Sequence, residues 1–323
     1  MKRHLESFNL QSLERIMNEL GAVPRIFNSE AQFQFELAWK IKEEFDCEVK
    51  LEELSRTSQS TNYKGSIITK KDYTDIIIED DRQRIALELK YKTATPDNIH
   101  IPGNILLMNH GAADLGAYDF LWDVHRIQIL TGNEDEGEVR MPCNRGYAII
   151  LTNDSHYWNT NSNNKTTNHG INRNFLIGDS TEGDAFLLKG KHNWYKTDGT
   201  IGLSKALEKD TSRKNSIHIT NDYPYKWKEY CTPIADRNGI FKYMIVEING
   251  TMETKKNIIK DKITTQLAKH IEKKYGYRWI KCVDLAMSAS WWYKNYTIDE
   301  LSAIDINDLV AKVFLEIDND EIQ

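Results

Sequence analysis

Two neighbouring segments decide how this chain folds: Tyr73-Thr-Asp-Ile-Ile-Ile-Glu-Asp80 and Arg84-Ile-Ala-Leu-Glu-Leu-Lys-Tyr91. The first is rich in β-branched residues, and the second alternates apolar and polar side chains, as half-buried strands do. The polar stretch Asp80–Gln83 separates them. The pattern therefore predicts a β-hairpin, with Ile76, Ile78, Leu87 and Leu89 turned into the core.

The register of this hairpin would place two carboxylates opposite each other. Asp75 lies six residues before Asp81, and Glu88 lies six residues after Arg82, so a turn centred between Asp81 and Arg82 pairs them. Their Cβ atoms would then be about 5 Å apart. Like charges so placed repel unless a cation lies between them, and Mg²⁺ favours a few carboxylate oxygens plus waters and phosphate. Alternation puts Lys90 on the same face as Glu88, near a metal-bound water or a phosphate oxygen.

The elements around the hairpin alternate between helix and strand. Helical spacing predicts helices over residues 12–20, 29–45 and 112–130, and strand patterns cover 47–54, 146–152 and 239–248. The order helix, three strands, helix, strand predicts an α/β fold whose mixed central sheet is flanked by helices. On the second helix, the predicted buried stripe comprises Ala31, Phe35, Ala38, Ile41 and Phe45.

Three regions follow from this organisation. Residues 1–152 form the α/β core, residues 153–238 are a loop-rich insertion rich in Asn and Gly, and residues 239–323 add one core strand and a helical C-terminal region. Residues 255–281 are strongly basic and residues 299–323 strongly acidic. The basic stretch either contacts phosphates or packs against the acidic tail, and the sequence favours neither.

Composition narrows the function classes. The 323 residues carry 42 Lys and Arg against 48 Asp and Glu, and hydrophobic residues make up 40%, as in soluble globular proteins. No apolar run is long enough to span a membrane, and no secretory signal is present. Four widely spaced cysteines predict a reduced, cytoplasmic protein. There is no phosphate-binding loop for ATP and no GxSxG nucleophile motif.

The set Asp75, Glu88-Leu89-Lys90 resembles the motif of the PD-(D/E)xK nucleases, whose fold many type II restriction endonucleases share. The resemblance covers about residues 29–152, including the αβββαβ order. Thr74 stands in place of the motif Pro, and the following helix lacks the Gln of the recombination-nuclease branch. Residue by residue, Asp75, Glu88 and Lys90 match the motif, and Glu36 matches an acidic residue on the preceding helix.

The resemblance implies a restriction-endonuclease-like core and a Mg²⁺-dependent endonuclease that hydrolyses phosphodiester bonds of double-stranded DNA, with Mn²⁺ as a substitute ion. Asp75, Glu88, the Leu89 carbonyl and Glu36 would bind metal, and Lys90 would orient or deprotonate the attacking water. A homodimer is implied for cutting both strands. Two alternatives stay open: a non-catalytic nucleic-acid- or partner-binding protein on the same scaffold, and a repair or recombination nuclease.

Contacts to DNA are expected from two places. Tyr118, on the helix after the hairpin, would face the site. The stretch Lys189–Lys196 interleaves basic and aromatic residues, so Lys191, Asn193 and Trp194 are candidate nucleic-acid contacts, together with the Asn-rich residues 159–174. Each of these has an ordinary alternative as a surface or core residue.

Overall fold

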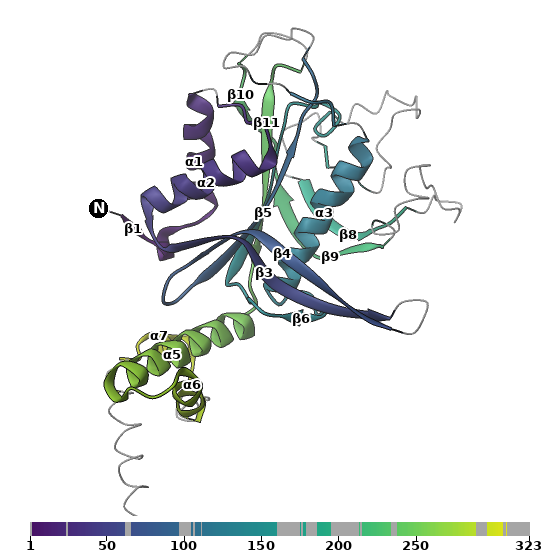
Figure 1. The fold of residues 1–323 in the computed structure, drawn as a ribbon. Coiled ribbons are helices and arrows are strands. Elements are labelled where there is room, and N and C mark those ends of the chain that lie inside the picture. Colours follow the sequence, from purple (N-terminus) through teal and green to yellow (C-terminus); the bar gives the residue numbers. More distant parts are fainter. Residues whose placement is uncertain are drawn as a thin grey trace, which may run out of the picture.

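A seven-stranded mixed sheet forms the centre of the molecule in the computed structural model (Figure 1). The strand order is β10-β11-β7-β5-β4-β3-β6. The strands are β3 (Glu48–Thr61), β4 (Ile67–Glu79), β5 (Arg84–Lys92), β6 (Glu138–Val139), β7 (Arg145–Thr152), β10 (Lys228–Cys231) and β11 (Phe241–Asn249). The structure describes residues 2–23, 25–61, 66–96, 105, 107–110, 112–159, 175, 177–178, 186–194, 213, 215–233, 238–288, 296–305 and 308.

Helices cover both faces of this sheet, which confirms the predicted α/β architecture. Helices α1 (Leu10–Ala22) and α2 (Glu30–Glu44) pack on one face, where the odd-numbered apolar residues of β5 join their core. Helix α3 (Ala113–Leu130) crosses the other face and packs on β5 and β7. The side chains of Glu88 and Lys90 on β5 lie on the face covered by α3, where they contact Arg126 and Asp123.

The β4–β5 hairpin has the predicted register. Ile76 pairs with Leu87 and Glu79 with Arg84, in antiparallel order. The turn is closed by a hydrogen bond from the Asp80 amide to the Gln83 carbonyl, 3.1 Å long. Leu87 and Leu89 are fully buried beside α1 and α2, as the alternation predicted.

The paired part of the hairpin is short, however. The ladder between β4 and β5 covers only Ile76–Glu79 and Arg84–Leu87. Beyond it β4 stays paired with β3, while β5 stays paired with β7 as far as Lys92. The two strands therefore diverge, and Asp75 lies where the fork between them opens.

The predicted buried stripe of the second helix is borne out in part. Ala38, Ile41 and Phe45 are buried as expected, whereas Phe35 is 54% exposed and Ala31 is also exposed. This helix carries apolar side chains on more than one face, so periodicity alone did not select the face that packs on the sheet.

The remaining elements lie around this core. The insertion contributes a two-stranded sheet of β8 (Phe186–His192) and β9 (Ile217–Tyr225), which was not predicted and packs on α3. A two-stranded parallel sheet pairs β1 (Arg3–His4) with β2 (Phe45–Asp46). The C-terminal region forms α5 (Met252–Tyr275), α6 (Trp279–Ser288) and α7 (Ile298–Ser302), with a small core of their own. Among the described residues, no helix combines the length and apolarity needed to cross a bilayer.

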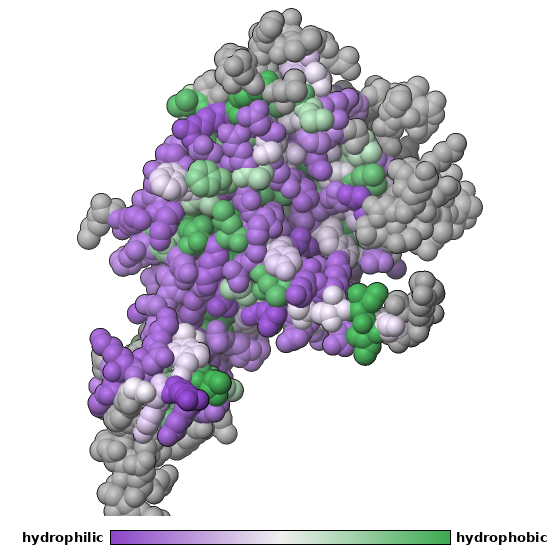
Figure 2. All heavy atoms as spheres, in the orientation of Figure 1, coloured by the Kyte–Doolittle hydropathy of each residue, from purple (hydrophilic) through white to green (hydrophobic). Residues whose placement is uncertain are grey.

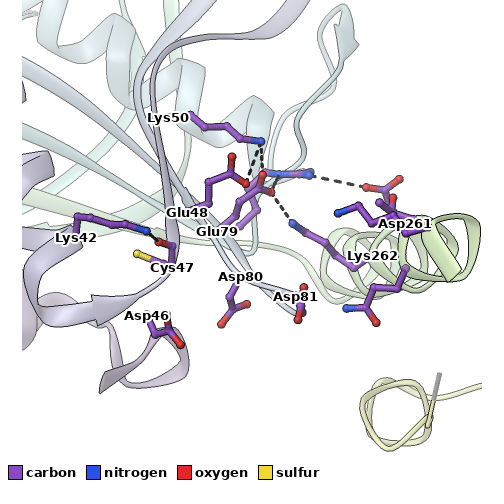
Figure 3. A pocket seen from close by; sticks show the side chains of 14 residues that line it. Lys42, Asp46, Cys47, Glu48, Lys50, Glu79, Asp80, Asp81, Asp261 and Lys262 are labelled. Atoms are coloured by element: carbon purple, nitrogen blue, oxygen red, sulfur yellow. Dashed lines mark hydrogen bonds and ion pairs between the residues drawn. The ribbon is translucent and has the colours of Figure 1, made fainter. Parts of the chain in front are cut away.

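Glu79, at the end of β4, ties the C-terminal helices to the sheet (Figure 3). Its carboxylate is 5% exposed and pairs with Lys50 of β3 at 2.5 Å, Arg84 of β5 at 2.9 Å and Lys262 of α5 at 2.6 Å. These contacts border a hollow of about 620 Å³ between α5 and the hairpin turn. Burial raises the pKa of Glu79, but Lys262 and Lys50 outweigh it and lower the pKa from 4.5 to about 2.

Replacing Glu79 by Gln is therefore expected to destabilise the protein at neutral pH by on the order of 2–4 kcal/mol, since the buried Arg84 and the partly buried Lys50 and Lys262 lose the carboxylate that they share. Because the folded pKa lies below the usual value, this stabilisation is present above about pH 4.5 and is lost as the pH falls toward 2. Urea unfolding at pH 7 and pH 3 measures it. Glu48→Gln is the control of equal charge change: Glu48 also lies near Lys50, at 3.8 Å, but its side chain is 65% exposed, so the loss should be much smaller. Equal losses in both variants would contradict a special role of the buried Glu79.

Candidate active site

Among the described residues, no strand pairs with β5 beyond Leu87 on the side of β4, and side chains take the place of a strand there. The Leu89 amide donates to Asp75 Oδ2 at 2.6 Å, and the Tyr91 amide donates to Glu30 Oε2 at 2.7 Å. The Thr93 amide contacts His110 Nδ1 at 3.0 Å. Buried backbone amides need such partners. Two carboxylates are thereby held at an open strand edge, next to the Leu89 carbonyl.

On the face toward α3, further charges gather around the same point. Lys90 Nζ lies 3.0 Å from Asp123 Oδ2 and 4.0 Å from Glu30 Oε1. Arg126 Nη2 lies 2.9 Å from Glu88 Oε1, and Arg126 Nη1 lies 3.6 Å from Asp123 Oδ1. Asp123 and Arg126 come from one turn of α3, and Lys90 and Glu88 from one face of β5.

Three of the carboxyl groups are protonated more easily than usual. Burial, followed by the neighbouring charge of Asp123, raises the pKa of Asp75 from 3.8 to about 7. Burial also raises the pKa of Glu88 well above its usual range and that of Asp123 above its own. The site holds four carboxyl groups, counting Glu30, against two cationic side chains. Full ionisation would leave it short of positive charge, which a bound cation would supply.

Lys90 is held as an ammonium. Burial by itself would lower its pKa, but the carboxylates of Asp123, Glu30 and Asp75 raise it well above the usual value. Its Nζ also donates to the Leu89 carbonyl at 3.2 Å. Lys90 therefore serves as a fixed hydrogen-bond donor and positive charge, and in this arrangement it is a poor proton acceptor.

The carboxylate of Glu88 lacks a hydrogen-bond donor. Within the part of the chain that the structure describes, both of its oxygens are buried without one. Arg126 Nη2 lies 2.9 Å from Glu88 Oε1, close enough for an ion pair but without the geometry of a hydrogen bond. Such buried acceptors are costly unless a ligand or ion satisfies them, so Glu88 in particular is suited to a bound cation.

The site is open to solvent on one side. The Glu30 side chain is 41% exposed, and those of Arg126 and Lys90 are 17% and 16% exposed. Glu88 and Asp123, by contrast, are almost fully buried. A charged ligand can thus reach Lys90 and Asp75 from outside while Glu88 lies beneath them.

The structure brings Asp75, Glu88, Leu89 and Lys90 close to one another. The predicted cross-strand pair of Asp75 and Glu88 is absent from the β4–β5 ladder, which ends at Ile76 and Leu87. The expected position of Glu36 is wrong: its carboxylate pairs with Arg25, 24% exposed. On α2 it is Gln34 that reaches the fork, where it donates to the Asp75 carbonyl at 2.6 Å. Two residues along a helix turn about 200°, so Glu36 points away from the site and Glu30 is the acid of α2 that faces it.

Two of the predicted nucleic-acid contacts are core residues. Tyr118 is 2% exposed and donates from its hydroxyl to the Asn215 carbonyl, and Trp194 is 3% exposed and donates to the Arg213 carbonyl. Their rings pack on each other with centres 5.5 Å apart. Lys191 is exposed and Asn193 is half-buried, and for them contact with nucleic acid stays a prediction. The Asn-rich residues 160–174 lie outside the described residues.

Sequence reasoning missed Glu30, Asp123 and Arg126. Glu30 directly follows the capping residue Ser29, so its position at the start of α2 resembled an ordinary first-turn acid. Asp123 and Arg126 could have been found because they are charged residues within a largely buried helix. They border its apolar residues Val124 and Ile127. A buried Asp inside an apolar stripe calls for a partner, which here is Lys90.

The donor set fits Mg²⁺. Among the described residues, no three His, Cys, Asp or Glu side chains are gathered so that they would hold a metal ion by themselves. Mg²⁺ does not require this, because it keeps several waters and binds through one or two carboxylates and substrate phosphates. Asp75, Glu88 and the Leu89 carbonyl supply the oxygens, and the unsatisfied oxygens of Glu88 are the observation that favours the fit.

Comparisons with known proteins give no relative to compare the site with: no family model, no curated protein and no solved structure matches the chain.

Proposed function

We propose that this protein is a Mg²⁺-dependent endonuclease that hydrolyses phosphodiester bonds in double-stranded DNA. The observation that carries the proposal is the fork, where Asp75 and the Leu89 carbonyl lie at an open strand edge above Glu88 and beside the ammonium of Lys90. Neighbouring carboxylates next to a fixed lysine suit a cation and a phosphate, and they cost stability without such ligands.

In the proposed mechanism, Asp75, Glu88 and the Leu89 carbonyl would hold the metal ion. When bound, Mg²⁺ lowers the pKa of a coordinated water and neutralises charge on the phosphate. Lys90 donates hydrogen bonds to the attacking water or a phosphate oxygen, and its raised pKa assigns it this role rather than proton abstraction. Arg126, paired with Glu88 and Asp123, keeps the buried carboxylates in place.

The PD-(D/E)xK nucleases are the family that this arrangement suits best. Supporting observations are the order of α2, β3, β4, β5, α3 and β7, and the two acids and lysine on the middle strands. Within that class we favour a type II restriction enzyme, since the chain has no phosphate-binding loop for ATP. Cutting both strands would require a homodimer. A repair or recombination nuclease remains the neighbouring alternative.

Incubation with plasmid DNA tests the proposal directly. With Mg²⁺ or Mn²⁺ the protein should convert supercoiled plasmid into cut products, and EDTA should prevent this. Discrete fragments would select the restriction enzyme, and a smear or end-dependent degradation would select the repair nuclease. Intact plasmids of several sequences after incubation with either metal would contradict a nuclease.

One observation favours a non-catalytic DNA-binding protein as the second candidate. The guanidinium of Arg126 already lies against Glu88, so part of the charge that a metal would balance is balanced within the chain. Thermal unfolding separates the two functions: Mg²⁺ should raise the melting temperature of a nuclease of this design, because it binds the folded state. A melting temperature that Mg²⁺ leaves unchanged, with DNA binding retained, would favour the binder.

A further inference from the structure

The outer half of the β3–β4 hairpin forms a two-stranded ribbon that extends beyond the sheet (Figure 1). From Arg56 to Thr61 and from Ile67 to Asp72 the two strands pair with each other, and only Arg56 and Thr57 also pair with β6. Described residues 66–71 are all exposed. On β4 the ribbon ends at Asp72, three residues before Asp75.

The root of the ribbon is fixed rigidly. Arg56 and Asp72 are 3% and 8% exposed and pair across the two strands, with Arg56 Nε 2.8 Å from Asp72 Oδ2. Arg126 donates to the Tyr73 carbonyl, which joins the root to the ion pair at Glu88. On the side of the ribbon that carries Asp72, Lys70 packs over the Trp122 ring of α3, with Nζ 5.4 Å from its centre. The ribbon therefore projects from the candidate active site in a set direction.

On the other side of the ribbon, the Thr57 hydroxyl donates to Glu138 Oε2 at 3.1 Å, and among the described residues no ion pair is found farther out. Strand alternation puts Lys71, Thr69 and Ile67 on the side of β4 that also carries Asp75, and Gln59 pairs with Thr69 across the ribbon. Lys71 makes no ion pair with any residue that the structure describes. At the tip, Ile67 is 70% exposed and Ile68 is 49% exposed, and Figure 2 shows this apolar spot within a mostly hydrophilic surface.

We propose that this ribbon enters the major groove of double-stranded DNA and reads base pairs beside the cleaved bond. The inference rests on the proposed function and adds its recognition element. A two-stranded β-ribbon fits the major groove, which is about 12 Å wide. Lys71 supplies positive charge for a phosphate, and the outer residues of the ribbon carry no acid up to the paired Asp72. These features favour a polyanion as the partner of the ribbon.

The side of the ribbon that carries Gln59, Thr69 and Ile67 would face the bases, and these side chains predict which base pair is preferred. Gln donates and accepts toward adenine, and apolar side chains contact the thymine methyl group. Gln59 with Ile67 thus predicts that an A·T pair is recognised. Thr69 lies six residues from Asp75, about 20 Å along the strand. The pair should therefore lie within one helical turn, about 34 Å, of the cleaved bond.

Binding in EDTA tests the ribbon separately from cleavage. The probe is a fluorescent 30-base-pair duplex pool with a randomised centre, titrated at several salt concentrations, and the bound fraction is sequenced. Lys71→Ala should weaken binding several-fold on all sequences and reduce the salt slope by about 1. Gln59→Ala should keep most of the non-specific affinity and lose about 10-fold of the preference at one A·T pair. Lys226→Ala, an exposed lysine outside the ribbon, is the matched control.

Each other outcome overturns the inference. If the wild-type protein binds duplexes and both ribbon variants bind and select as it does, another surface reads the DNA, although the nuclease proposal survives wherever plasmid is cut. If the wild-type protein binds no duplex, both proposals fail. If Ile67→Ser converts a dimer into a monomer without changing DNA affinity or selection, the ribbon is a self-association surface instead.

Discussion

A variant in which Asn replaces Asp75 is expected to be more stable than the wild-type protein and yet unable to cut DNA. Asp75 is surrounded by Asp123, Glu30 and Glu88, and its own burial makes ionisation costly. Asn keeps an oxygen that can accept from the Leu89 amide, but it carries no charge. The variant therefore keeps the capping of β5 and removes the repulsion.

The shifted pKa of Asp75 predicts at which pH its charge destabilises the folded protein. The folded pKa of Asp75, about 7, lies above the 3.8 of an ordinary Asp. Between these values the folded state binds more protons than the unfolded state, so ionised Asp75 costs on the order of 2–4 kcal/mol above pH 7 and nothing below about pH 4. Without metal, Asp75→Asn should melt several degrees higher at pH 8, and the advantage should disappear at pH 4.

Magnesium supplies the second measurement. Mg²⁺ should raise the melting temperature of the wild-type protein, since it binds only the folded state, and should leave that of Asp75→Asn nearly unchanged. Asp81→Asn, an exposed turn residue, is the matched control and should respond to Mg²⁺ as the wild-type protein does. An equal Mg²⁺ response in Asp75→Asn, or a loss of stability at pH 8, would remove Asp75 from the metal site.

The hairpin register was predictable because local sequence determines it. The polar turn and the apolar alternation of β4 and β5 leave one register that buries Ile76, Ile78 and Leu87 together. Once the register is set, Asp75, Glu88 and Lys90 come near one another. The local pattern therefore predicted the proximity of these side chains, and their role stays a prediction.

The fork was not predictable by the same means. Where β4 leaves β5 depends on its longer pairing with β3, which extends to Thr61. That divergence exposes the edge of β5 and brings Glu30, rather than Glu36, to the Tyr91 amide. The choice of face on α2 was equally hidden, because Phe35 and Trp39 stack on the exposed side of a helix whose other apolar residues are buried.

Contacts between distant elements account for the other errors. Tyr118 and Trp194 pack together only because β8 and β9 cover α3, and the pattern of residues 153–220 gave no sign of that sheet. Their aromatic rings therefore looked like surface candidates. Asp123 and Arg126 contact Lys90 and Glu88 of β5. The spacing of residues within α3 does not predict which strand packs against it, so these contacts could not be expected from the sequence.

Removing the side chain of Lys90 should abolish cleavage while leaving DNA affinity within a few-fold of the wild-type value. The ammonium is held beside the Leu89 carbonyl and Asp123, where it would donate to the attacking water or a phosphate oxygen. Loss of such a charged donor is expected to slow cleavage by about 10³-fold, or roughly 4 kcal/mol in the barrier. Single-turnover cleavage and binding in EDTA separate the two effects.

Lys90→Ala alone should also lower stability, because the buried Asp123 loses its ion pair with Lys90. Among the described residues, Arg126 is then its remaining cationic neighbour. The double variant Lys90→Ala/Asp123→Asn removes the pair together and should recover much of that stability, because replacing both partners costs less than orphaning one. It should remain inactive. Lys92→Ala, one pleat along the same strand, should cut at a rate close to wild type. If the folded double variant cut DNA as fast as the wild-type protein, the site would have to be placed elsewhere, since the lysine beside the fork would then take no part in the reaction.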